Sequence, residues 1–194
     1  MFLDHVEFSK NNYTNRVKIR TKEGSKWLTV PIPKGYSHAR ICDVPLLETS
    51  DWVKTHIKTL LGQYKTAPYF DETLLNNIYN VRAKLICEFN IHAIQTICKH
   101  IGINTPTIRS SDLGVTSDLK STELLLEIVQ RVGGTVYLSG AGAKTYLDTT
   151  LFEDNHKRVV YTEFQEKEYT QNQPGFISGL TVLDKLFNTE TVFD

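Results

Sequence analysis

The chain has 194 residues, of which 40% are hydrophobic and 23% charged, and its 22 basic side chains are balanced by 22 acidic ones. This composition excludes a disordered chain, a collagen-like repeat and a low-complexity scaffold, and it predicts one domain of ordinary size that folds alone or as a homo-oligomer. A formal net charge of zero without a long run of Lys and Arg argues against broad nucleic-acid binding, which needs clustered cations.

The sequence carries no pattern of membrane insertion or secretion. No run approaches the ~18 apolar residues that span a bilayer, and residues 1–10 lack the basic start and apolar run of a signal peptide. Cys42, Cys87 and Cys98 form no CxxC pair, and their odd number and wide spacing fit core thiols better than a disulfide framework. We therefore expect a cytoplasmic protein.

The first third of the chain predicts a β-hairpin. Strict alternation over residues 15–20 places Val17 and Ile19 on one face of a strand and basic side chains on the other. A polar turn at residues 22–25 then leads to a partner strand over residues 27–32.

Two helical regions follow the hairpin. Apolar residues at helical spacing predict a helix that ends near residue 64 and is capped by Ser50 or Asp51. A second helical pattern covers residues 72–101, and its length of some 30 residues indicates a break into two helices.

The second half of the chain alternates short strands with helices, which is typical of βαβ units. We expect strands over residues 107–109, 136–138 and 158–164 and helices over residues 121–131 and 180–187. The predicted fold class is therefore α/β, with a partly parallel sheet, flanking helices and an N-terminal β-hairpin. No linker divides the chain.

The loop after the 136–138 strand is a candidate anion site. Ser139, Gly140 and Lys144 lie where a strand runs into small residues and an expected helix start, so backbone N–H groups and one ammonium group face the same space. The loop matches neither the Walker pattern nor the dinucleotide-binding fingerprint. An ordinary tight turn is an equally good interpretation.

A second candidate site follows the 107–109 strand. Arg109, Ser110, Ser111 and Asp112 come at the carboxyl end of a strand, where ligands of parallel sheets bind. A guanidinium at such a position commonly pairs with a carboxylate or phosphate. The two serines and the aspartate also fit a local turn, because these residues form turn hydrogen bonds with the backbone.

No metal site is expected, because the six histidines show neither an HExxH motif nor another metal-type spacing. His5, which follows Asp4 and precedes the basic strand, is a candidate general acid or base. An ordinary surface or core histidine is the alternative. Asp112 is the other candidate base.

Nine short blocks of the sequence, in this order, resemble the WbqC-like family. They are DHVEFSK (4–10), YTNR (13–16), WLTVP (27–31), APYF (67–70), RSSDLG (109–114), YLSG (137–140), YL (146–147), VLD (182–184) and LFN (186–188). The resemblance covers nearly the whole chain, which we interpret as a single WbqC-like α/β domain over residues 1–194.

The resemblance implies a bacterial cytoplasmic protein of O-antigen (lipopolysaccharide) and other surface-polysaccharide biosynthesis, with a suggested role in glycine transfer. Family members usually begin with a strand and an aromatic, Gly-containing loop ahead of the Asp4 block, and this sequence starts after that element. If the loop helps to build the active site, the chain is expected to fold without being active.

The family blocks imply one shared pocket that holds anions. Its expected substrate-binding residues are Lys10, Asn15, Arg16, Arg109, Ser110, Ser111, Gly140 and Lys144, and its expected catalytic residues are His5, Asp112 and Ser139. Cations would hold the anionic parts of the substrates, and the backbone at Ser139 and Gly140 would stabilise a developing oxyanion. Asp184 and Asn188 also fall in a matching block, where we expect them to brace the last helix.

The resulting prediction is a transferase that moves a small acyl or aminoacyl group, such as glycine, to a nucleotide-linked or lipid-linked sugar. One alternative is a nucleotidyl-transferring or ATP-dependent activating enzyme, which would require Mg²⁺. The other is a non-catalytic binding or assembly subunit of a glycan-modifying complex, because the sequence shows no recognisable nucleophile motif.

Overall fold

A computed structural model describes residues 1–48, 51–115 and 119–191, and its contacts divide the chain into two compact units. The hairpin unit comprises Asp4–Pro106 and the segment from Glu166 onward. The βαβ unit comprises Met1–Leu3 and Thr107–Gln165. The mixture of helices and strands confirms the predicted fold class, with an antiparallel hairpin in one unit and a parallel strand pair in the other.

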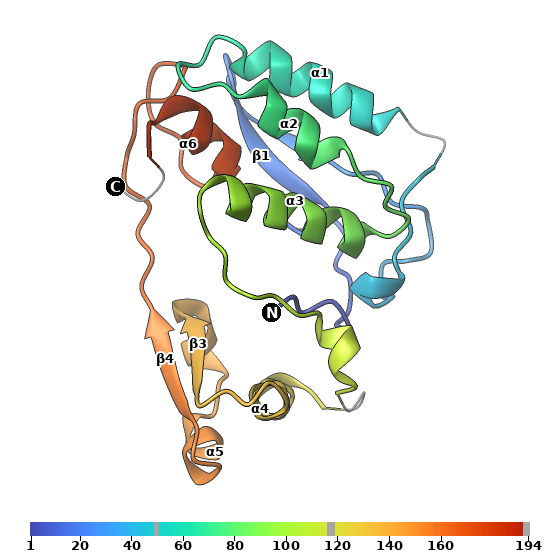
Figure 1. Cartoon of the computed structure of the whole chain (residues 1–194), viewed down its shortest axis with the longest axis vertical. Helices are drawn as coiled ribbons and strands as arrows, with labels where there is room; N and C mark the ends of the chain where they lie inside the picture. Colours follow the sequence, from blue (N-terminus) through green and yellow to red (C-terminus); the bar gives the residue numbers. More distant parts are fainter. Residues whose placement is uncertain (49–50, 116–118, 192–194) are drawn as a thin grey trace. The chain divides into compact units, whose positions relative to one another are not determined.

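The hairpin unit begins with the predicted antiparallel strand pair (Figure 1). Strand β1 (Arg16–Thr21) pairs with β2 (Gly24–Thr29) in a register that sets Lys18 opposite Trp27. The tight connection requires Gly24, whose φ of +123° is unfavourable for residues that carry a Cβ. The alternation expected from the sequence is confirmed, because Ile19 is fully buried on one face.

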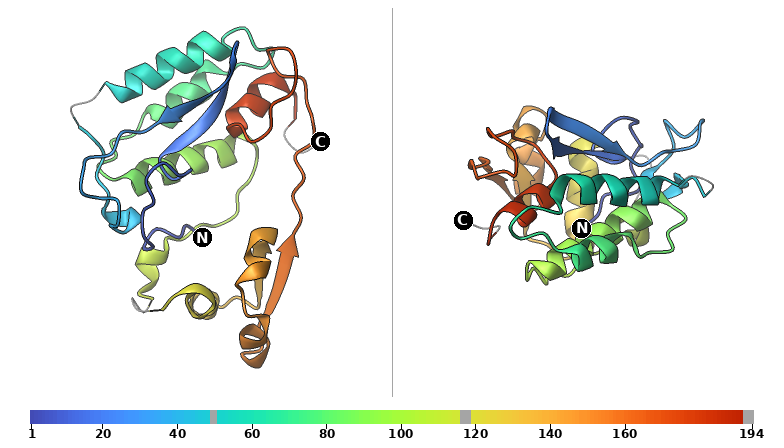
Figure 2. Two further views of the ribbon diagram at one scale, coloured as in Figure 1. Left: turned by 180° about the vertical axis from the view of Figure 1, so that it is seen from behind. Right: turned by 90° about the horizontal axis from the view of Figure 1, so that it is seen from above.

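Helices cover one face of this hairpin, as Figure 2 shows in its view from above. They are α1 (Trp52–Tyr64), α2 (Glu72–Tyr79), α3 (Ile86–His100) and α6 (Val182–Asn188), with a short 3-10 helix, η1 (Ile41–Asp43), before them. The expected break of the 72–101 region is confirmed. Ser50, one of the two predicted caps of α1, lies outside the described residues, and the Asp51 side chain pairs with Lys54 at 3.0 Å instead of capping the helix.

A long-range pairing explains where the 72–101 helical region breaks. Leu85 forms an antiparallel bridge with Pro45, and the Ile86 N–H donates to the Val44 carbonyl at 2.9 Å. The backbone of this segment is therefore extended and bonded to another part of the chain, so the helix cannot continue through it.

The main core of the hairpin unit lies between the hairpin and the helices. Ile19 and Leu28 from the strands pack with Leu60 of α1, Leu75 of α2 and Phe187 of α6, all of them buried. A second cluster surrounds Phe8, Val44, Ile86 and Phe89. Burying apolar area at about 25 cal/mol per Å² is the main favourable contribution to folding this unit.

A buried histidine ties the first helix to the hairpin. His56 Nε2 lies 2.9 Å from the Thr29 carbonyl oxygen, and its Nδ1 lies 3.2 Å from the Tyr79 hydroxyl. Burial lowers the pKa of His56, which favours the neutral imidazole at this position. His56 is thus a structural residue that joins α1, α2 and β2.

The βαβ unit contains a parallel strand pair with helices packed on one face. Its regular elements are η2 (Ser110–Leu113), α4 (Ser121–Arg131), β3 (Val136–Gly140), η3 (Ala141–Thr145), α5 (Thr149–Asp154) and β4 (Arg158–Thr162). Strands β3 and β4 pair in parallel with Ser139 opposite Tyr161. Leu126, Val129 and Phe152 form the buried core beneath them.

Two local predictions for this unit were wrong. The strand expected over residues 107–109 is a single parallel bridge between Phe2 and Arg109, because the chain turns into η2 immediately afterwards. The helix start expected after Ser139 is the 3-10 helix η3, only five residues long. A helix this short has little of the aligned peptide dipole that attracts an anion to a helix N-terminus.

The helices in the described ranges include none with the length and apolar character that a bilayer crossing requires.

A buried carboxylate joins the last helix to the first strand and the first helix. Asp184 of α6 is fully buried, and its two oxygens accept hydrogen bonds of 2.8 Å from the hydroxyls of Tyr64 and Tyr169. The Tyr64 oxygen in turn accepts the Arg20 backbone N–H at 2.9 Å. Asn188 donates to the Asp184 carbonyl at 2.7 Å, so both residues brace α6 as expected.

We predict that Asp184 makes stability depend on pH. Burial raises the pKa of Asp184, although hydrogen bonds from the two tyrosines and the charge of Arg20 oppose the shift. The folded chain therefore holds this proton more tightly than the unfolded chain. The contribution of Asp184 to unfolding free energy is largest below about 3.9, the ordinary Asp pKa, and is lost as the pH rises through the raised folded pKa.

Asp184→Asn removes this titration while keeping a side chain of the same shape. Urea unfolding of both proteins across the acidic range should show the wild type losing stability relative to the variant as the pH rises, by at most about 1.4 kcal/mol per pH unit. Parallel stability curves would contradict the prediction.

Candidate functional site

The predicted site residues are divided between the two units. His5, Lys10, Asn15 and Arg16 belong to the hairpin unit, and Arg109, Ser110, Ser111, Asp112, Ser139, Gly140 and Lys144 belong to the βαβ unit. The expected pocket that combines both sets stays a prediction, and each set is described within its own unit.

The carboxyl ends of β3 and β4 bring together the predicted Ser139 and Gly140. The Ser139 side chain is buried, and its hydroxyl donates to the Gly140 carbonyl at 3.4 Å, while Thr162 Oγ1 of β4 donates to the Ser139 carbonyl at 3.2 Å. Beside the Cα atoms of Gly140 and Gly142, no heavy atom of the described βαβ residues lies within 4 Å of an added Cβ. The backbone of this loop is therefore open to a close approach by a ligand.

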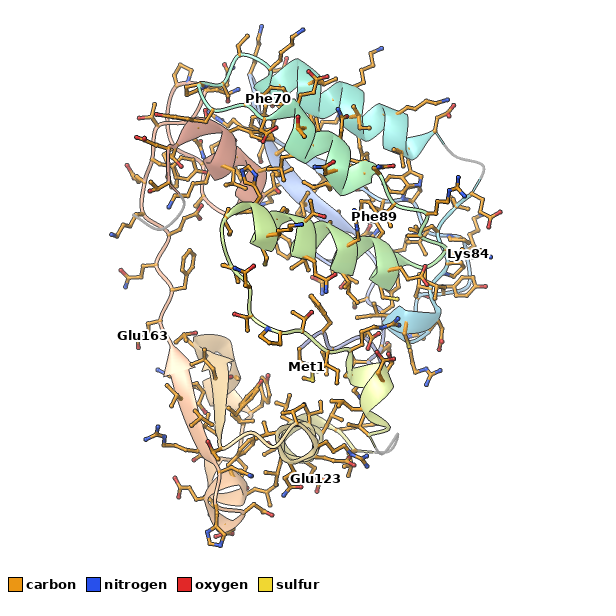
Figure 3. The ribbon with its side chains drawn as sticks, in the orientation of Figure 1. Met1, Phe70, Lys84, Phe89, Glu123 and Glu163 are labelled. Carbon is orange, nitrogen blue, oxygen red and sulfur yellow. The ribbon has the colours of Figure 1, made fainter. Side chains whose placement is uncertain are left out.

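Lys144 lies near the same strand ends. Its ammonium group is 3.5 Å from Glu163 Oε1 and 5.4 Å from the centre of the Tyr161 ring. Glu163 directly follows β4 and is labelled beside the tip of that strand in Figure 3. Because the ion pair is exposed and long, it contributes little stability, and an anionic ligand can replace Glu163 at low cost.

Residues 109–114 form a turn. This is one of the two structures that the sequence predicts for them, the other being a ligand site at the end of a strand. Ser110 is fully buried and its backbone N–H donates to the Phe2 carbonyl at 2.8 Å, whereas Ser111 is half-buried and Asp112 is exposed. The Asp112 N–H donates to the Arg109 carbonyl at 3.2 Å inside η2. Asp112 is thus the most accessible side chain of this turn, and a substrate-binding role for the block stays a prediction.

The hairpin unit presents the predicted Arg16 on the face of β1 opposite Ile19. The Arg16 guanidinium carbon lies 4.0 Å from the centre of the Trp27 ring, and the Lys18 ammonium lies 5.2 Å from the same centre. Tyr13 packs edge-on against Trp27 with ring centres 5.6 Å apart. Lys18, Trp27 and Tyr13 were missing from the predicted site.

The sequence held a signal for two of these three residues, Lys18 and Trp27. Alternation puts Lys18 on the same face as Arg16, and an aromatic residue in the partner strand is the usual neighbour of such cations. Lys10 and His5 belong to the same block of sequence; Lys10 is exposed and His5 is half-buried.

The Asn15 side chain forms hydrogen bonds with backbone groups beside the hairpin. Its side chain is buried, donates to the Val30 carbonyl at 3.2 Å and accepts the Asn11 N–H at 3.1 Å. Asn11 has a φ of +63°, so this acceptor helps to hold a turn conformation that few residues with a Cβ adopt. The amide therefore shapes the loop that carries Tyr13.

Among residues 1–48, 51–115 and 119–191, no cluster of three or more His, Cys, Asp and Glu side chains is arranged to hold a metal ion.

Comparison with known proteins agrees with the blocks found in the sequence. The model of the WbqC-like protein family matches residues 1–192. The chain belongs to the WbqC-like protein family. It is 31% identical over 190 residues to the uncharacterized protein Rv1507c of Mycobacterium tuberculosis, an alignment that covers 95% of this WbqC-like chain and 81% of that protein. No solved structure matches the chain.

We predict that Asn15→Ala destabilises this WbqC-like protein. The substitution leaves the Val30 carbonyl and the Asn11 N–H without their side-chain partner, and an unmet buried hydrogen bond costs about 1–3 kcal/mol. Chemical denaturation measures the loss. As a control, Asn12→Ala removes an exposed amide from the same loop. Its oxygen accepts the Tyr13 N–H at 2.7 Å, but water can replace this exposed bond, so the unfolding free energy should change by less than about 0.5 kcal/mol. Equal losses for the two variants would contradict the prediction.

Proposed function

We propose that this WbqC-like protein is a transferase of surface-polysaccharide biosynthesis. It moves a small acyl or aminoacyl group, such as glycine, onto a sugar that is carried by a nucleotide or a lipid. Family membership supports the glycan context, and the loop between β3 and β4 supports the chemistry. The enzyme would act in the cytoplasm, where activated sugars are made.

The observation that carries the proposal is the position of Lys144 beside an open glycine loop at the carboxyl ends of two parallel strands. Ligands of parallel sheets bind at this edge. A cation and accessible backbone N–H groups there suit an anionic donor and the negative charge that develops on the acyl oxygen during transfer.

The burial of Ser139 favours direct transfer over a covalent serine intermediate. Its hydroxyl donates to the Gly140 carbonyl and is not exposed as a nucleophile. In direct transfer, a hydroxyl or amine of the acceptor sugar attacks the acyl carbon, the donor leaves with the bonding electrons, and a base takes the attacking group's proton. Of the two predicted bases, Asp112 is exposed and His5 is half-buried, which favours Asp112.

The same observation about Ser139 favours a second candidate function, a non-catalytic binding subunit of a glycan-modifying complex. Such a subunit would use the anion sites for recognition alone. Ligand binding without turnover distinguishes it from a transferase.

We predict that an anionic donor or an activated sugar stabilises the wild type in a thermal-shift panel and that Lys144→Ala and Arg109→Ala remove that stabilisation. Loss of a charge-assisted hydrogen bond costs about 1.5–3 kcal/mol, which weakens binding about tenfold or more. Arg158→Ala is the matched control, because it removes an exposed cation from the amino end of β4.

The proposed site is abandoned if Lys144→Ala and Arg109→Ala respond to these ligands like the wild type. A wild type that binds an activated sugar but never transfers glycine or another acyl group to it supports the binding subunit. Stabilisation by ATP only with Mg²⁺ supports the activating enzyme instead.

A further inference from the structure

The outer face of the hairpin holds two cations at fixed positions around one aromatic ring. Arg16 and Lys18 project from the same face of β1, and both lie within 6 Å of the centre of the Trp27 ring. Cation–π attraction of about 0.5–1 kcal/mol for each exposed cation favours these positions over free movement in solvent. All three side chains are half-buried, so each remains accessible to a ligand.

In the described part of the hairpin unit, no carboxylate oxygen lies within ion-pair distance, 4.0 Å, of these two cations. Neither Arg16 nor Lys18 forms an ion pair there, and the buried Nε of Arg16 has no hydrogen-bond partner among these residues. Arg20, the third cation of the face, instead donates to the carbonyls of Gly24 and Pro174 at 3.1 and 2.6 Å. On the described outer face, the Arg20 side chain is therefore bonded to the backbone, whereas those of Arg16 and Lys18 are not.

Two like charges around one ring repel each other, and a bound anion offsets that repulsion. A guanidinium suits phosphate because its planar N–H groups donate to two oxygens at once, and an ammonium adds a second, more mobile donor. Two adjacent cations therefore match two linked phosphoryl groups better than one carboxylate. Tyr13, which is 61% exposed beside Trp27, adds an aromatic surface for the ring of a sugar or a base.

We propose that Arg16, Lys18, Trp27 and Tyr13 form a binding site for the diphosphate group of an activated sugar. Arg16 and Lys18 bind the phosphoryl oxygens, Trp27 holds both cations in place, and Tyr13 contacts the ring attached to the diphosphate. The inference rests on the proposed function for the choice of a sugar carrier, and it adds the chemical group by which that carrier is recognised.

Isothermal titration calorimetry with three probes tests this site. Inorganic pyrophosphate presents the diphosphate alone, UDP-glucose presents it on a nucleotide-linked sugar, and farnesyl diphosphate presents it on a lipid. Arg16→Gln and Lys18→Gln should each weaken the binding of pyrophosphate about tenfold or more, because each removes a charge-assisted hydrogen bond. Lys58→Gln, which removes an exposed cation of α1, should leave the affinity unchanged.

Tyr13→Ala separates the ring contact from the diphosphate contact. It should weaken the binding of UDP-glucose severalfold and leave that of pyrophosphate unchanged. Tighter binding of UDP-glucose than of farnesyl diphosphate identifies a nucleotide-linked sugar as the ligand, and the reverse order identifies a lipid-linked one. Thermal unfolding of each variant checks that it is folded.

The inference is overturned if the wild type binds none of the three probes, or if both charge variants bind pyrophosphate like the wild type. The experiments distinguish a failure of this inference from a failure of the proposed function. Diphosphate binding that depends on Arg16 in a protein without transferase activity keeps this site and removes the transferase. Transfer activity that Arg16→Gln and Lys18→Gln leave unchanged keeps the transferase and removes this site.

Discussion

The hairpin unit depends on one buried carboxylate. Asp184 is fully buried, and it accepts one hydroxyl from α1 and another from the segment before α6. Because a buried carboxyl group is costly without hydrogen-bond partners, the hydroxyls of Tyr64 and Tyr169 favour the packing of α6. Tyr64 also accepts the Arg20 N–H of β1, so one hydroxyl connects the first strand, the first helix and the last helix.

This connection determines what the other face of the hairpin can do. With Ile19 and Leu28 buried against the helices, the alternation of β1 leaves its cations on the opposite side. Near the turn, the Arg20 guanidinium donates to the Pro174 carbonyl. Pro174 belongs to the same segment as Tyr169, whose hydroxyl bonds to Asp184. The buried inner face therefore determines the position of the backbone from which the outer cations project.

Local patterns in the sequence predicted the hairpin, most of the helices and the strands β3 and β4, because each depends on residues close in the chain. They did not predict the short helix α5 (Thr149–Asp154). They did not predict features that depend on distant partners. The length of the 72–101 pattern indicated that this helical region breaks, but the position of the break depends on pairing between Leu85 and Pro45. The expected 107–109 strand is a bridge to Phe2. For the site, alternation identified the basic face, but only the strand register shows that Trp27 contacts two cations.

The cations of the two units differ in the groups that surround them. Lys144 faces Glu163 in an exposed ion pair at 3.5 Å, so an incoming anion must compete with a carboxylate that is free to move away. Arg16 is held over an aromatic ring, which attracts its charge without neutralising it. A ligand that binds Arg16 gains the whole attraction of that cation. A ligand that binds Lys144 gains only the excess over the attraction that Glu163 already provides. An anion that binds Arg16 therefore displaces no carboxylate, whereas an anion that binds Lys144 must displace Glu163.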